Sequence, residues 1–167
     1  MDTGLSTNIL ASADDFYEAH KRCLEGKRTR QEGGAKVSDI VSIPAIANGS
    51  FACELYLKFI GDYKGKEHRL NEIFNSLTAD LKNAILDEKT ISDLNKISVR
   101  YGHQNFDELF EEMGNTFVEW RYIFEKDHPA GFYGNRINEY LDVLNILLNR
   151  LAFVAASLSF NKALKND

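Results

Sequence analysis

The sequence has little of what would hold a small protein together through covalent bonds or a metal ion. It contains two cysteines, Cys23 and Cys53, which are too few for a disulfide framework and lack the spacing of metal ligands. No uninterrupted apolar run approaches the thickness of a bilayer, and the N-terminus has no basic region followed by a long apolar stretch. We therefore expect reduced thiols and a cytoplasmic protein with neither an evident secretion signal nor a membrane span.

An excess of positive charge is also absent. The formal net charge is -5, which argues against a broad surface that coats nucleic acid, so a polyanion would have to bind at a local basic patch. The chain has two such patches, one made of Lys21, Arg22, Lys27, Arg28 and Arg30 and a smaller one made of Lys64, Lys66, His68 and Arg69.

The pattern that is present is helical. Of the 167 residues, 44% are apolar and 27% are charged, as in soluble globular proteins. We find no strand-like alternation, no Gly-rich phosphate loop and no internal repeat, whereas apolar residues recur at three- and four-residue steps. The predicted helices cover residues 8–25, 44–63, 67–77 with a continuation through 78–90, 105–128 and 134–164; residues 26–38 are predicted to be a loop and 91–103 a polar turn. These elements predict an all-α, up-and-down bundle of about five helices in a single domain, residues 1–167.

The helix expected over residues 44–63 is apolar nearly all round, which places it at the centre of the bundle. Glu54 and Lys58 are its exceptions, one turn apart in the favourable acid-first order. Asn48, Gly49 and Ser50 are small and would let a neighbouring backbone approach closely, at some loss of helix propensity. We expect this helix to be the core element.

The helix expected over residues 105–128 carries a column of polar residues beside its buried seam. Arg121 and His128 are seven residues apart, so at about 100° per residue they lie about 20° apart around the helix axis, with Glu125 between them. The pair could bind and cleave a phosphodiester, or it could be polar residues at the edge of a core. The apolar seam beside them consists of Phe106, Phe110, Met113, Phe117, Trp120 and Phe124.

Two neighbouring stretches resemble the HEPN superfamily of small helical bundles. The run from Ser50 to Lys58 is similar to the family's small-x-x-x-Glu-Leu-x-Leu-Lys helix, and His68-Arg69-Leu70, with Ile73, Phe74 and Leu77, resembles the His-x-Leu-x-x-Leu helix that follows it. The resemblance covers residues 44–158, with the first helix and the basic loop, residues 8–41, outside it. Many HEPN proteins are metal-independent ribonucleases that act as homodimers, often as toxins or in anti-phage defence, through an Arg-x4-6-His motif.

The resemblance implies that Arg121 and His128, with six residues between them, are the catalytic pair. An imidazole can take a proton from a ribose 2′-hydroxyl or return one to the leaving 5′-oxygen, while a guanidinium can bind the phosphate. No metal and no cofactor are required. Supporting residues are Glu125 and Glu54, either of which could pair with Arg121, and Tyr122, which stands where the family commonly has a polar residue.

Other interpretations stay open at this point. Arg121 could be tied to carboxylates and His128 could cap a helix, which would leave a non-catalytic HEPN-like module that binds a nucleotide or a protein partner of the nucleotidyltransferase type. A plain structural bundle is the third alternative. Lys27, Arg28 and Arg30 are candidates for contact with RNA or could form a solvated loop. His68 is expected to start a helix rather than to bind a ligand, and His20 and His103 look incidental.

Overall fold

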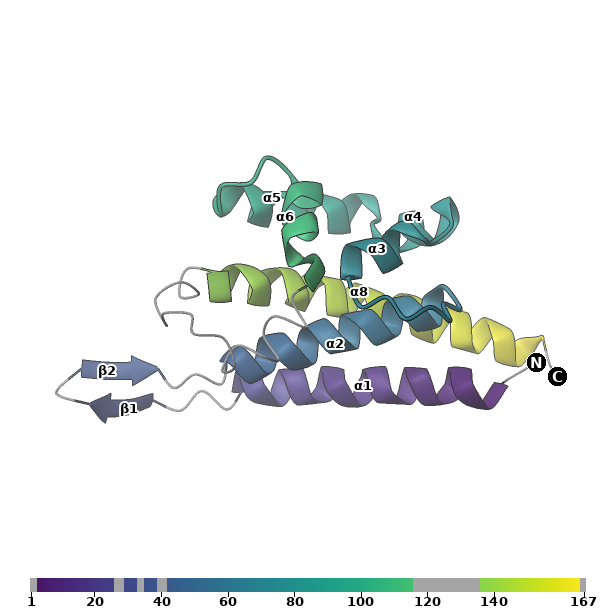
Figure 1. Ribbon diagram of the computed structural model, residues 1–167, viewed down its shortest axis with the longest axis horizontal. Coiled ribbons are helices and arrows are strands. Elements are labelled where there is room, and N and C mark those ends of the chain that lie inside the picture. The colour runs from purple at the N-terminus through teal and green to yellow at the C-terminus, as the bar shows by residue number, and fades with distance from the viewer. Residues whose placement is uncertain (1–2, 26–28, 33–34, 39–41, 116–135, 166–167) are drawn as a thin grey trace.

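A computed structural model describes residues 3–25, 29–32, 35–38, 42–115 and 136–165. Over these ranges the chain forms seven α-helices, one 3-10 turn and one β-hairpin (Figure 1). The helices are α1 Thr3–Glu25, α2 Ser42–Ile60, α3 Leu70–Asn75, α4 Ala79–Ile85, α5 Glu88–Arg100, α6 Phe106–Glu112 and α8 Arg136–Leu164, the 3-10 turn is η1 Met113–Asn115, and the strands are β1 Thr29–Glu32 and β2 Ala35–Ser38.

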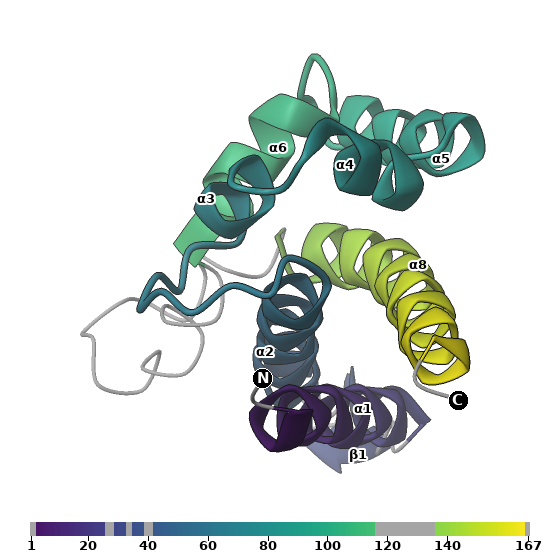
Figure 2. The same cartoon turned by 90° about the vertical axis from the view of Figure 1, so that its right-hand side faces the viewer.

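The helices form two groups. The long helices α1, α2 and α8 run side by side, and the short helices α3 to α6 lie across α2 and α8 on the side away from α1 (Figures 1 and 2). The predicted all-α class is confirmed, although the described ranges hold seven helices where about five were expected.

The extra helices come from local capping between residues 67 and 103. The Thr78 hydroxyl accepts a hydrogen bond from the backbone N–H of Leu81, and the Asp87 carboxylate accepts one from the N–H of Thr90, so a new helix begins after each of these residues. The predicted polar turn at 91–103 was therefore wrong, because residues 91–100 belong to α5. The buried face of α5 consists of Thr90, Leu94, Ile97 and Ser98.

Helix α2 is the core element, as predicted. It packs against α1 on one side and α8 on the other, and the largest side chains that it buries completely are Ile46, Tyr56 and Leu57. Gly49 of α2 faces α1, where a Cβ atom would lie 2.7 Å from Nδ1 of His20. The close approach at Gly49 is made by a side chain, the buried His20 imidazole, and not by the backbone that was expected; Nδ1 of His20 donates a hydrogen bond to the Ala45 carbonyl.

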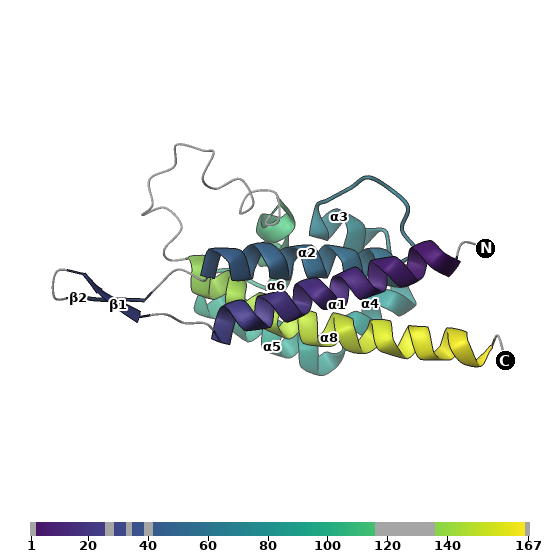
Figure 3. The ribbon, with the colours of Figure 1, turned by 90° about the horizontal axis from the view of Figure 1, so that it is seen from below.

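The predicted loop at 26–38 contains the hairpin instead. Glu32 pairs with Ala35 and Arg30 with Val37 in an antiparallel ladder, and Gly33-Gly34 is the sequence between the strands. The hairpin extends past the ends of the long helices, opposite the Thr3 end of α1 and the Leu164 end of α8 (Figure 3).

The helix predicted over 105–128 is described only in its first half. Phe106, Phe110 and Met113 are buried as expected, but the α-helix ends at Glu112 and continues as the 3-10 turn η1. A Cβ atom on Gly114 would lie 2.4 Å from Oδ1 of Asn71, so η1 packs closely against α3. The remainder of this predicted helix lies outside the described residues.

Helix α8 buries most of its predicted seam against α2 and the short helices. Within its stretch Ile137–Leu164, an 18-residue window has a mean hydropathy of 1.7, and α8 is, among the described helices, the one that is long and apolar enough to cross a bilayer. Leu144, Leu148, Leu151 and Ala155 of this stretch belong to the protein core. The same apolar length therefore serves as a core helix in this fold.

Candidate functional site

The pair predicted to be catalytic lies outside the described residues. Arg121, Tyr122, Glu125 and His128 all fall within 116–135, so their predicted roles stay predictions. The same holds for Lys27 and Arg28, two of the three RNA-binding candidates. The third candidate, Arg30, lies in β1 opposite Val37.

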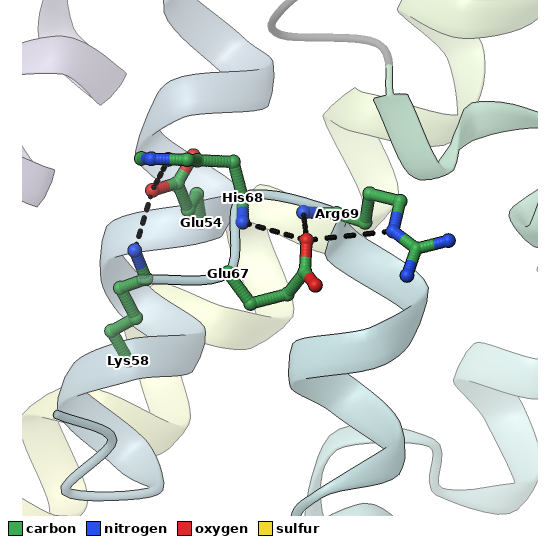
Figure 4. Close-up of polar contacts among 5 residues, drawn as sticks. All are labelled: Glu54, Lys58, Glu67, His68 and Arg69. Atoms are coloured by element: carbon green, nitrogen blue, oxygen red, sulfur yellow. Dashed lines mark hydrogen bonds and ion pairs between the residues drawn. The ribbon is translucent and has the colours of Figure 1, made fainter. Parts of the chain in front are cut away.

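Glu54, the remaining predicted residue, is at the centre of a cluster of charged side chains. Helix α2 places it at the bundle's interior, where its side chain is 1% exposed. Its Oε1 atom accepts hydrogen bonds from Nζ of Lys58 at 2.8 Å and from Nδ1 of His68 at 2.9 Å (Figure 4). The predicted Glu54–Lys58 pair is therefore confirmed, and His68, which comes from the segment between α2 and α3, joins it.

The contact with Glu54 fixes the orientation of the His68 ring. An ionised carboxylate only accepts hydrogen bonds, so Nδ1 of His68 must carry the hydrogen that it shares with Glu54. In the neutral ring the lone pair is then on Nε2, the nitrogen that Glu54 does not engage. The His68 side chain is 55% exposed, in contrast to the buried carboxylate behind it. Glu54 therefore holds the imidazole from its buried side, while the rest of the ring faces solvent.

The backbone that carries His68 is held by a second carboxylate. Oε1 of Glu67 accepts hydrogen bonds from the backbone N–H groups of His68 and Arg69, both at 2.9 Å, and lies 3.4 Å from Nε of Arg69 (Figure 4). The two backbone hydrogen bonds lower the pKa of the Glu67 carboxyl. The carboxylate therefore stays ionised near neutral pH and continues to accept these hydrogen bonds. Arg69 also contacts Glu72 at 3.2 Å.

The surface beside His68 carries charges of both signs, because Asp62, Glu67 and Glu72 lie among its basic residues. Lys64, Lys66 and Arg69 are exposed within a few residues of it, and Lys58 is 13% exposed next to Glu54. Side chains of this kind attract anions such as phosphate groups. The cluster of Glu54, Lys58 and His68, which we call the α2–α3 cluster, thus combines a fixed imidazole with nearby exposed lysines, Lys64 and Lys66. Within the described ranges no group of three or more His, Cys, Asp or Glu side chains could hold a metal ion.

A second histidine–carboxylate contact, which sequence reasoning missed, lies at the opposite end of the short helices. Nε2 of His103 is 2.5 Å from Oε1 of Glu139 in α8, and Nδ1 is 3.7 Å from Oε1 of Glu112 in α6. The His103 side chain is only 8% exposed. The one available signal was Gly102, whose φ of +97° ends α5 and turns the chain toward α8. Because this imidazole is enclosed, it ties three helices together rather than facing a ligand.

The α2–α3 cluster is therefore the candidate site, because its imidazole is exposed. Its residues come from two segments: Glu54 from α2 and His68 from the segment between α2 and α3. His68 can exchange a proton at Nε2, Glu54 orients it, and the neighbouring cations can hold an anion. No match to this chain was found among protein-family models, curated proteins or solved structures.

Proposed function

We propose that this protein is a HEPN-like protein that binds and cleaves RNA as a metal-independent endoribonuclease, working as a homodimer in the cytoplasm. The observation that carries the proposal is the hydrogen bond between Glu54 and His68. These residues come from the two separate stretches on which the resemblance depends, and the fold brings them together. An exposed imidazole with lysines nearby, as at His68, suits a phosphodiester substrate.

In this proposal Arg121 holds the scissile phosphate and His128 transfers a proton to the leaving 5′-oxygen. Glu125 and Glu54 are candidates to orient the guanidinium, and Tyr122 lies beside it in the sequence. Lys27, Arg28 and Arg30 would contact the RNA backbone. Each such contact neutralises a phosphate, so their replacement by Gln should weaken RNA binding and reduce its salt dependence together.

The test is RNA cleavage by the purified protein in the presence of EDTA. We expect wild type to cleave, and Arg121→Ala and His128→Ala each to lose at least about 100-fold in rate, the usual contribution of a proton-transfer group or an oxyanion donor. Arg100→Ala is the matched control, because Arg100 is a 65% exposed arginine of α5 far from the α2–α3 cluster in the sequence. Intact RNA with wild type, or equal cleavage by the variants with unchanged helical content, would exclude the enzyme.

The C-terminal half of α8 supports the dimer in this proposal. Phe153 and Phe160 are 63% and 65% exposed, and seven residues of helix place them on one face, with exposed Ala156 and Ser157 between them. No charged residue occurs from 151 to 161. In an antiparallel pair with its two-fold axis between Ala156 and Ser157, each Phe153 would meet the partner's Phe160. The stripe is thus self-complementary, as a two-fold interface requires.

A non-catalytic module is the second candidate, and a feature of α5 favours it. A shallow hollow on the outer face of α5 is lined by Ile91, Ser92, Asn95, Lys96 and Val99. Val99 is 61% exposed, so this face offers apolar area to a protein such as a nucleotidyltransferase-type partner. If RNA is bound without cleavage, or a nucleotidyltransferase binds and Val99→Glu abolishes that complex, the module would replace the enzyme.

A further inference from the structure

We propose that the β-hairpin is a docking surface for a second copy of this chain. In this pairing the outer edge of β1 lies antiparallel to the β1 edge of the other copy, about a two-fold axis at Gln31. Arg30 of each copy lies opposite Glu32 of the partner subunit, and the two hairpins form one four-stranded sheet. The inference goes beyond the proposed function, because the pairing requires neither RNA nor the exposed stripe on α8.

The first observation is the separation of the hairpin from the helices. Within the described residues its sheet has two strands, and both lie beyond the ends of the long helices (Figures 1 and 3). A two-stranded hairpin by itself is at best marginally stable in water. The unpaired N–H and C=O groups along its outer edges are a template for another strand. The edge of β1 is therefore free to pair, and pairing would stabilise the hairpin.

The register of the hairpin shows which backbone groups point outward. Glu32 pairs with Ala35 across the two residues that connect the strands, and a pair in that position exchanges both backbone hydrogen bonds. Hydrogen-bonded pairs alternate with non-hydrogen-bonded ones along an antiparallel ladder, so the next pair, Gln31 with Lys36, is of the second kind. The backbone N–H and C=O groups of Gln31 therefore point away from β2, toward the open edge of β1.

The charges of β1 favour one register between two such edges. Arg30 and Glu32 have opposite signs and lie on either side of Gln31 in the sequence. When Gln31 pairs with the partner subunit's Gln31, each Arg30 lies directly opposite a Glu32, and opposite charges in facing positions attract. A register centred on Arg30 or on Glu32 would instead bring like charges together. Charged residues on an edge usually deter pairing between copies, whereas this order of charges makes the edge self-complementary.

The outer edge of β2 has no such complementarity. Lys36 is the one charged residue in the sequence of β2, Ala35–Ser38. Two copies that met through β2 could place Lys36 only opposite another lysine or opposite an uncharged residue of that strand. The attraction between opposite charges is therefore specific to the β1 edge.

The deciding experiment measures self-association of the purified protein by sedimentation over a dilution series. RNA is left out, because Arg30 is also a candidate for contact with RNA, and every protein carries Phe153→Glu so that pairing through α8 does not contribute. We expect dimers. Arg30→Glu places carboxylate opposite carboxylate and should raise the dissociation constant at least about 10-fold. Lys36→Glu makes the same change of charge on β2 and, as the control, should leave the dimer intact.

Two further measurements test the register. Arg30→Glu combined with Glu32→Arg restores opposite charges at the wild-type net charge and should restore association. The two single variants, each weakly associating alone, should form a mixed complex with each other, since one edge is then acidic and the other basic. Gln31→Pro removes the outward N–H without removing a hydrogen bond between β1 and β2, and should abolish the dimer.

The outcomes separate this inference from the proposed function. A Phe153→Glu protein that is monomeric at every concentration, or a dimer that is insensitive to Arg30→Glu, would overturn the pairing of the β1 edges. Failure of the double reversal to restore association would overturn the register at Gln31. Absence of RNA cleavage alongside dimers that respond to these variants would remove the enzyme and leave the docking surface in place.

Discussion

At the scale of single residues, the contact between Gly49 and His20 joins α1 to α2 most tightly. The imidazole of His20 is fully buried and is fixed by its hydrogen bond to Ala45, so it cannot move aside easily. A Cβ atom on Gly49 would lie 2.7 Å from it, closer than atoms in van der Waals contact. The glycine is retained in a helix interior in spite of its poor helix propensity because nothing larger fits.

A double-mutant cycle tests this contact. Gly49→Ala should destabilise the protein by about 1–3 kcal/mol through overpacking. In a His20→Ala background the obstacle is gone, and the same substitution should stabilise by up to about 1 kcal/mol, because alanine is the better helix former. Urea unfolding measures all four proteins. A destabilisation of equal size in both backgrounds would show that His20 is not the obstacle.

The same histidine makes a prediction about pH. Burial lowers the pKa of His20 below its usual 6.5, because a charged ring would be desolvated. As pH falls below about 6.5 the unfolded chain takes up a proton that the folded chain refuses, so stability decreases with falling pH in that window. His20→Asn can still donate to Ala45 but does not titrate. Between about pH 7.5 and 5.5 the variant should lose less stability than wild type, as measured by urea midpoints. Identical losses would contradict the prediction.

Sequence reasoning reached some of these residues and not others. Glu54 and Lys58 were paired correctly because both lie on one helix, where a four-residue step fixes their distance. The partner of Glu54 across the following segment, His68, could not be predicted, since the path of residues 61–69 depends on packing and on the Glu67 hydrogen bonds. His103 and Glu139 are 36 residues apart and meet only through the tertiary fold.

At the scale of helices, Arg150 of α8 fastens the junction between α4 and α5. Its Nε donates to the Ala84 carbonyl at 2.8 Å, Nη2 donates to the same carbonyl, and Nη1 lies 3.0 Å from the Asp87 carboxylate. Ala84 lies in the last turn of α4 and Asp87 caps α5. One guanidinium therefore holds two helix ends onto α8.

Replacing Arg150 by Lys should show how much the several N–H donors of the guanidinium contribute to the free energy of unfolding. A single ammonium cannot reproduce the paired hydrogen bonds to the Ala84 carbonyl, and their loss should cost about 1–3 kcal/mol. Amide hydrogen exchange should rise first in α4 and α5. Arg100→Lys is the control, since Arg100 is 65% exposed with a 3.5 Å contact to Asp142. Equal effects of the two substitutions would refute the special role of Arg150.

The strength of the apolar pattern decided which helices could be predicted from the sequence. The long apolar patterns of α1, α2 and α8 were sufficient to predict α2 and α8 to within three residues at each end, whereas α1 begins at Thr3, five residues before its predicted start. Helix α5 was missed although its sequence carries helix signals: Asp87 is an N-cap residue, and Ile91, Leu94 and Ile97 recur at three-residue steps. Its few apolar residues among many polar ones made the segment resemble a polar turn, and its packing against α8 is a tertiary contact that the sequence does not show.

At the scale of the whole molecule, the exposed stripe on α8 bears on oligomeric state. If two copies pair through it, Phe153→Glu and Phe160→Glu should each place a carboxylate in an apolar contact and raise the dimer dissociation constant at least about 10-fold. Light scattering over a dilution series measures the change. Val99→Glu, an equally exposed apolar position on α5, is the control and should leave the dimer intact. A wild-type protein that is monomeric throughout would dismiss the interface.

The helix ends at Thr3 and Leu164 share one end of the molecule, and the β-hairpin lies at the other (Figure 3). A circularly permuted chain, with a flexible linker across the old termini and new ones opened at Gly33-Gly34, should consequently retain all of the described helices. An attachment tag could then be placed at either end of the molecule: at the original termini in the natural chain, or at the hairpin in the permuted chain. If the protein binds RNA as proposed, attaching it by one end or the other would show which end of the molecule has to stay free for binding.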